Sequence, residues 1–203
     1  MVRKSDCHPP RAHGIKETLM DDPRYQDMIA FLKELGTDDI PHTDKPFLAH
    51  LISVYRDLER WGGSLPLCRA GMFHSIYGTE KFRNFSISID QRPRVQELIG
   101  EQGESLAFWN CFMDRTAWDT IFIDQTGERQ LVNRETAEVY ALSQEEFDEL
   151  TTLQICDWLE QVPRSQEWDY RREAYRQMAL HTGGIAIEEY DRVFALETSA
   201  QGE

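Results

Sequence analysis

From residue 22 onward the chain is a succession of short amphipathic segments, most of them bounded by glycine or proline. The first places its apolar residues three and four positions apart: Tyr25, Met28, Ile29, Phe31, Leu32 and Leu35. That spacing puts the side chains on one face of an α-helix, which Pro23 begins and Gly36 ends. Because each such helix has an apolar face to bury, the sequence predicts helices packed against helices.

The same signals predict the remaining helices. Gly62-Gly63 separates two of them, and so short a connection favours antiparallel packing. The expected helices cover residues 44–61, 64–74, 92–99, 101–113, 143–162, 166–182 and 185–196. Alternating apolar and polar residues over 120–134, around "QTGE", predict a β-hairpin. We therefore expect a mostly α fold, a helical bundle with one short β-hairpin.

The chain is long enough for one domain with a substantial core. It has 203 residues, of which 40% are hydrophobic and 11% aromatic, and a chain of this length buries roughly two thirds of its unfolded surface. Residues 1–20 are polar, contain prolines and show no period, so we expect a flexible N-terminal arm there. Residues 21–203 are expected to form a single domain.

Charge and composition restrict the partners. The formal net charge is −14, and such a field repels nucleic acids and anionic membranes. No stretch approaches the roughly 18 apolar residues of a membrane span, and four cysteines without close spacing are typical of reduced thiols. The sequence therefore predicts a cytoplasmic protein whose main partner is neither nucleic acid nor a membrane. A small anionic substrate stays possible, because a local cluster of arginines can override the overall sign within a cleft, and self-association into a homo-oligomer is also left open.

Two histidines lie inside these helical patterns rather than in loops. His50 is placed between Phe47 and Val54, and His74 follows Gly71 on a face of the next expected helix. If the two helices pack antiparallel, the imidazoles lie close enough to share one ion. Imidazole binds zinc, manganese and iron, usually together with a carboxylate.

Asp114 is the expected third ligand, because it ends an apolar run in which a lone buried carboxylate is costly. His42, just before the second helix, is a further candidate from a loop that can fold over the ion. The residues alone leave two interpretations open. The histidines are either ligands of a divalent transition metal (Mn, Fe or Zn) or hydrogen-bonded core residues, and Asp114 is either a ligand or the partner of an arginine.

The stretch "AGMFHSIYGTE" and the His50–His74 spacing resemble the HD-domain superfamily of metal-dependent phosphohydrolases, including the alarmone hydrolases with their "AxLLHDxxED" helix. Residues 42–116 are more specifically similar to a family with "HTxxxFLxHL", "WG" and "AGLFHSxYGTE" motifs, known as a domain of unknown function. The resemblance implies an HD-like helical bundle with His50, His74 and Asp114 as ligands. The chain departs from the superfamily at Ser75, where a metal-binding aspartate is expected.

With a metal in place, the resemblance implies hydrolysis of a small phosphorylated or nucleotide-like substrate by a metal-activated water. Glu80 is then the expected general base, Arg92 a phosphate ligand and Tyr77 a hydrogen-bond donor to the substrate. Two alternatives stay open at this point. One is an iron-dependent HD-type oxygenase, and the other is a non-catalytic HD-like module that acts through protein contacts.

Overall fold

The computed structural model describes residues 22–200, and it confirms the expected mostly helical fold. The expected arm over residues 1–20 lies outside the described residues. The described helices are α1 (Tyr25–Glu34), α2 (Phe47–Arg60), α3 (Leu65–Phe73), α4 (Arg92–Ile99), α5 (Glu101–Phe112), α6 (Arg115–Ile123), α7 (Gln144–Ser165), α8 (Arg172–Thr182) and α9 (Gly184–Ala200), with a short 3₁₀ helix at Ile89–Gln91. Two small antiparallel hairpins complete them: β1 (Pro41–His42) with β2 (Lys45–Pro46), and β3 (Gln130–Val132) with β4 (Val139–Ala141).

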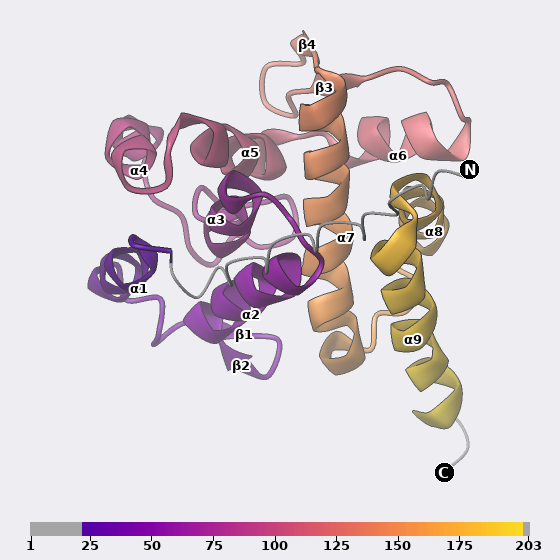
Figure 1. Ribbon diagram of the computed structural model, residues 1–203, viewed down its shortest axis with the longest axis horizontal. Helices are drawn as coiled ribbons and strands as arrows, with labels where there is room; N and C mark the ends of the chain where they lie inside the picture. Colours follow the sequence, from indigo (N-terminus) through magenta and orange to yellow (C-terminus); the bar gives the residue numbers. More distant parts are fainter. Residues whose placement is uncertain (1–21, 201–203) are drawn as a thin grey trace, which may run out of the picture.

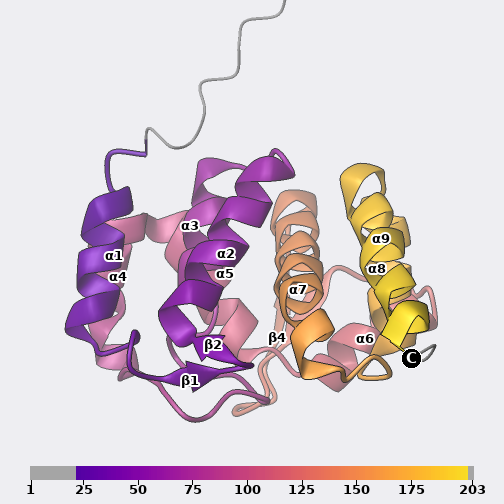
Figure 2. The ribbon, with the colours of Figure 1, turned by 90° about the horizontal axis from the view of Figure 1, so that it is seen from below.

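Helix α7 is the central element of the bundle. Figure 1 shows it running between a group that contains α2, α3 and α5 and a pair formed by α8 and α9, and it contacts all five. Seen from below, α1 and α4 lie at one end of the molecule and α8 and α9 at the other (Figure 2). Because neighbours surround it, α7 buries side chains on several faces, including Leu150, Leu153 and Trp158. A polar residue in the middle of α7 therefore lies inside the protein.

Helices α2 and α3 pack closely because α3 presents a glycine, which has no side chain, to α2. Gly71 of α3 faces α2, and a Cβ atom there would lie 2.5 Å from Leu58 Cδ1 and 3.3 Å from Val54 Cγ1. The connection through Gly62 and Gly63 makes the two helices antiparallel, as expected from its length. The beginning of α2 is thereby placed beside the end of α3.

The hairpin expected over residues 120–134 is wrong in its first arm. Residues 115–123 form α6, because Asp114 caps that helix by accepting a hydrogen bond from the Ala117 backbone N–H at 2.9 Å. Trp118 and Phe122, four residues apart, bury the helix face in the core. The second arm does form a strand, β3, but it pairs with β4 further along the chain.

A second hairpin lies where the sequence predicted a loop. β1 and β2 are joined by Thr43 and Asp44, which have φ angles of 44° and 62°. Positive φ at both central residues is the geometry of the tightest hairpin turns. This turn holds His42 against the start of α2. Within residues 22–200, no helix is both long enough and apolar enough to span a membrane.

Adding a side chain at Gly71 should separate α2 from α3. We expect Gly71→Val to lower the free energy of unfolding by about 1–3 kcal/mol, because overpacking forces neighbours out of their rotamers. Gly71→Ala should cost less, since its single methyl group displaces mainly the end of the Leu58 side chain and moves Val54 only slightly. Urea denaturation followed by circular dichroism measures both. An unfolding midpoint of Gly71→Val equal to that of the wild type would contradict the close approach.

Candidate metal centre

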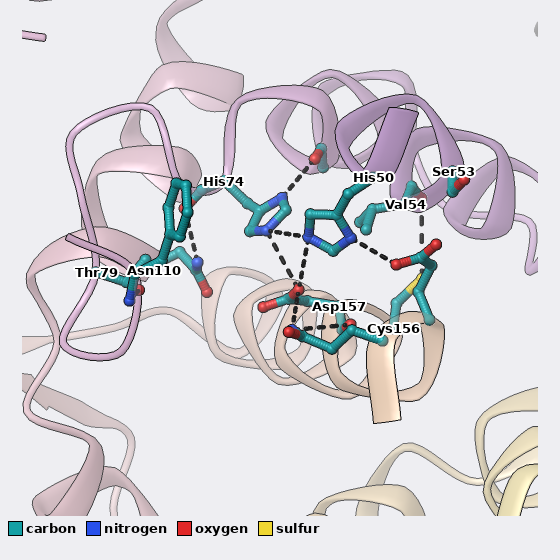
Figure 3. Close-up of polar contacts among 12 residues, drawn as sticks. His50, Ser53, Val54, His74, Thr79, Asn110, Cys156 and Asp157 are labelled. Atoms are coloured by element: carbon teal, nitrogen blue, oxygen red, sulfur yellow. Dashed lines mark hydrogen bonds and ion pairs between the residues drawn. The ribbon is translucent and has the colours of Figure 1, made fainter. Parts of the chain in front are cut away.

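The antiparallel packing of α2 and α3 brings His50 and His74 together. His50 lies in the first turns of α2, and His74 is the residue that closes α3. Both residues are fully buried, and their Nε2 atoms lie 3.2 Å apart. Figure 3 shows the two rings entering from neighbouring helices and meeting edge to edge.

The third member of the cluster comes from α7. One carboxylate oxygen of Asp157, Oδ1, lies 3.2 Å from His50 Nε2 and 3.3 Å from His74 Nε2. Asp157 is 5% exposed, and Figure 3 shows it below both rings. Among residues 22–200, these three form the group whose ligand atoms lie close enough to hold one metal ion.

Backbone and side-chain acceptors fix the orientation of both imidazoles. His74 Nδ1 lies 2.7 Å from the carbonyl oxygen of Gly71, and His50 Nδ1 lies 2.5 Å from Glu160 Oε2. Since both partners are acceptors, both Nδ1 atoms donate a proton, and the Nε2 atom of each ring is the one that faces the centre. Metal-binding histidines are oriented in this way in proteins generally.

The geometry and the donor types fit a divalent transition metal. Three electron-pair donors converge with separations of 3.2–3.3 Å, which is unfavourable unless a proton or a cation lies between them. The centre of such a triangle lies about 1.9 Å from each corner, close to the bond lengths of roughly 2.0–2.2 Å that imidazole and carboxylate form with zinc-like metals. Two imidazoles and one carboxylate suit zinc, iron or manganese.

Glu160 contacts His50 of the cluster on one side and two partly exposed cations on the other. One turn of α7 beyond Asp157, its carboxylate accepts from His50 and forms ion pairs with Lys45 and Arg164. Burial alone would raise the pKa of Glu160, but His50, Arg164 and Lys45 together lower it to about 2. Glu160 is therefore an anion at neutral pH and favours the Nδ1–H form of His50.

The charges within the cluster also stabilise one another. Burial opposes the charged form of Asp157, yet the two histidines hold the pKa of this carboxyl well below its usual range. Burial likewise disfavours a charged His50, but Asp157 and Glu160 raise its pKa. The surrounding carboxylates therefore favour positive charge at this place in the bundle. Gln161 donates from Nε2 to Asp157 Oδ1 at 2.9 Å and holds the carboxylate in place.

A second set of hydrogen bonds holds the end of α3. The carbonyl oxygen of His74 accepts from Asn110 Nδ2 at 2.8 Å and from the Cys111 thiol at 3.1 Å, both on α5. Asn110 in turn accepts from Gln154 of α7. Helices α3, α5 and α7 are thus tied together beside the cluster.

A pocket of about 170 Å³ opens beside His50 and Asp157. Its lining comes from segments far apart in the chain. They are the β1–β2 hairpin, α2, the segment after α3, the first turn of α6, the far half of α7 and the connection that follows α7. Its polar and aromatic lining includes His42, Ser75, Lys81, Arg115, Trp158 and Tyr170. The candidate metal centre is therefore shielded from bulk solvent, and this small cavity gives access to it.

Asp114, expected as the third ligand, is placed at the cap of α6, and the structure groups Asp157 with the histidines instead. The sequence carries the same signal for both carboxylates. Asp157 interrupts the apolar run "LQICDWLEQV" as Asp114 ends "FWNCFM". A carboxylate in an apolar run predicts a buried partner, but only the packing shows which partner. Glu160, which contacts His50, and Arg115, which lines the pocket beside the cluster, were given no role there from the sequence alone.

His42 lies against the cluster without joining it. Its ring centroid is 4.4 Å from that of His50, and its Nε2 is buried without a hydrogen-bond partner in the described part of the chain. Burial, with His50 nearby, lowers its pKa to about 4, so it is neutral at physiological pH. His42 as a metal ligand stays a prediction.

Two of the expected substrate-binding residues have another partner. Tyr77 donates from its hydroxyl to Glu104 Oε1 at 2.9 Å, and Arg92 forms an ion pair with the same buried carboxylate at 2.7 Å. Glu80 accepts a hydrogen bond from the backbone N–H of Arg115 at 3.3 Å. All of these contacts are with other residues of the protein, and none of them tests contact with a substrate. The roles expected of Tyr77, Arg92 and Glu80 toward a substrate therefore stay predictions.

Comparison with known proteins agrees with this fold. A family described as a domain of unknown function (DUF6817) matches residues 31–115, which confirms the resemblance noted for residues 42–116. No curated protein matches the chain at a significant level. Among solved structures, the chain is similar to a metazoan ortholog of SpoT that hydrolyses ppGpp, with a TM-score of 0.56, 10% identity, and coverage of 85% of this chain and 94% of the other. At that identity the likeness concerns the fold, which resembles that of an HD-domain protein and confirms the expected class.

Lowering the pH should destabilise the protein through His42. The unfolded chain binds a proton at His42 near pH 6.5, whereas the folded protein binds it only near pH 4. Between these values the unfolded state holds more protons, so the free energy of unfolding falls as the pH drops. Because part of the ring faces the pocket, we expect a loss of roughly 1 kcal/mol between pH 7 and 5.

Urea denaturation in the presence of a chelator, at both pH values, measures this loss. His42→Gln has no titrating ring and serves as the comparison, so its stability should depend less on pH than that of the wild type. Equal pH dependence of the two proteins would contradict the low pKa.

Proposed function

We propose that the protein is a metal-dependent hydrolase of a small phosphorylated substrate, with His50, His74 and Asp157 as its metal ligands. The observation that supports it most is the convergence of three buried electron-pair donors at 3.2–3.3 Å. The likeness to a protein that hydrolyses ppGpp supports it further, because the fold is the same and phosphate ester hydrolysis is a reaction that metal-bound water performs.

Each residue of the centre has a distinct part in this proposal. A divalent metal, when bound, supplies hydroxide at neutral pH by lowering the pKa of a bound water. Glu160 and the Gly71 carbonyl keep both Nε2 atoms free of protons. Gln161 orients the ligand oxygen of Asp157. The pocket admits the substrate on one side, and the apolar core excludes bulk water on the other.

Ser75 sets the charge of the centre. It follows His74 directly, is 4% exposed and lines the pocket at the position where the resemblance implies an aspartate. A hydroxyl leaves the ligand set with one negative charge rather than two. We therefore expect a single ion, bound less tightly than by a set with two carboxylates.

Metal content distinguishes the two aspartates. Protein purified without chelator should contain about one equivalent of manganese, iron or zinc by elemental analysis. Asp157→Asn should lose it, because the amide offers a much weaker ligand than a carboxylate. Asp114→Ala should keep the metal and lose about 0.5–2 kcal/mol of stability, since it removes only the cap of α6. The reverse result, with metal lost in Asp114→Ala and kept in Asp157→Asn, would restore the ligand set expected from the sequence.

Activity should follow the metal. With manganese added, we expect hydrolysis of one or more of a panel of small phosphate monoesters and ppGpp. Released phosphate is measured with a colorimetric assay, and inorganic pyrophosphatase is added for ppGpp so that released pyrophosphate is also detected. His74→Ala should lower kcat about 100-fold or more, because a bound metal contributes several kcal/mol to the transition state. Arg94→Gln, which removes a surface ion pair with Glu34, is the matched control and should be unchanged. A well-folded preparation that neither contains nor takes up metal would support the non-catalytic module instead.

A further inference from the structure

The pocket beside the metal centre contains a buried arginine that no carboxylate neutralises. Arg115 is 6% exposed and lines the pocket with His50 and Asp157. In the described residues its guanidinium has no ion pair, and its Nε has no hydrogen-bond partner. A buried cation without a partner is costly. The guanidinium is therefore arranged for an anion that the chain itself does not provide.

Other polar groups of the same pocket are also unsatisfied. Trp158 Nε1 and His42 Nε2 are buried and have no hydrogen-bond partner within residues 22–200. Both residues line the pocket together with Arg115. Buried polar atoms without a partner are uncommon in folded proteins. Arg115 Nε and Trp158 Nε1 can only donate, and His42 Nε2 can donate or accept, so three unsatisfied atoms around one cavity of about 170 Å³ indicate a ligand that offers hydrogen-bond acceptors.

A second cation faces the pocket. Lys81 Nζ lies 4.0 Å from the ring centroid of Tyr170 and 5.0 Å from that of Trp158, and it pairs with the half-exposed Glu167. Burial and the nearby charge of Arg115 lower the pKa of Lys81. Two like charges held beside one cavity repel each other unless an anion lies between them.

We propose that Arg115, Lys81 and the indole N–H of Trp158 form a binding site for the phosphoryl group of a phosphate monoester. This inference rests on the proposed function, because it places the reacting group of the same substrate beside the metal ligands. A phosphate monoester has up to two negative charges for the two cations and three terminal oxygens that accept hydrogen bonds. The planar guanidinium can bind two of those oxygens at once.

The size of the cavity limits what is attached to the phosphoryl group. Its volume of about 170 Å³ is below the roughly 300–1,000 Å³ that drug-sized ligands occupy. The pocket therefore encloses the phosphoryl group and a few further atoms, and any larger part of the substrate lies outside it. The selectivity of the site is for the charged group rather than for a nucleobase.

Titration of the full-length protein with inorganic phosphate tests this site. The protein is kept in chelator, so that the metal cannot contribute, and binding is measured by calorimetry. We expect one site in the wild type and a loss of affinity of about 10–100-fold in Arg115→Gln, as for loss of a charged hydrogen-bond partner. Arg94→Gln, on the surface, should bind phosphate as the wild type does.

A second measurement covers the case in which Arg115→Gln does not fold. The indole N–H signal of Trp158, assigned with Trp158→Phe, should shift when phosphate is added to the wild type. Lys81→Gln, at a side chain 34% exposed, should fold and bind phosphate more weakly. Phosphate affinity unchanged in both Arg115→Gln and Lys81→Gln, or a Trp158 signal that does not move, would overturn the inference.

Metal content, measured on the same preparations, separates this inference from the proposed function. If the protein contains metal as purified but does not bind phosphate when chelator is present, the phosphate site is overturned and the proposed function is not. Protein that binds phosphate but takes up no metal overturns the hydrolase and leaves an anion-binding module.

Discussion

The close approach of α2 and α3 is the contact on which the candidate site depends. Gly71 leaves room for Leu58 and Val54, so the two helix backbones lie nearer than side chains would otherwise allow. Antiparallel packing then places His50 opposite His74. A shift of this pair by one or two ångströms would separate the Nε2 atoms beyond the reach of one ion, since metal bonds of about 2 Å allow little variation.

Charges alternate from the surface to the centre of the bundle. Lys45 and Arg164 neutralise Glu160, which orients His50, whose other nitrogen faces Asp157. Each charge in this series therefore has a neighbour of opposite sign, which is the condition under which ionisable groups are tolerated inside a protein. The long helix α7 thus supplies both Asp157, the carboxylate of the candidate metal centre, and Glu160, which orients His50.

The pocket differs from the cluster in its balance of donors and acceptors. The cluster consists of electron-pair donors that require a cation, whereas Arg115, Lys81 and Trp158 are hydrogen-bond donors that require an anion. A metal ion and a phosphate ester bound side by side would meet both requirements. The fold shared with a ppGpp hydrolase agrees with that chemistry, but the same fold supports many functions. These residues, rather than the fold, therefore favour a hydrolase.

The sequence by itself determined the helices other than α6 and the proximity of the two histidines, because helical periodicity and a two-glycine connection are local properties. It did not determine the carboxylate. Asp114 and Asp157 both stand in apolar runs, and only the packing of α7 against α2 and α3 turns Asp157 toward the histidines while Asp114 caps α6. Arg115 was likewise indistinguishable from a surface arginine. Contacts between residues far apart in the chain are fixed by how whole helices fit together, and that information is not contained in any short segment.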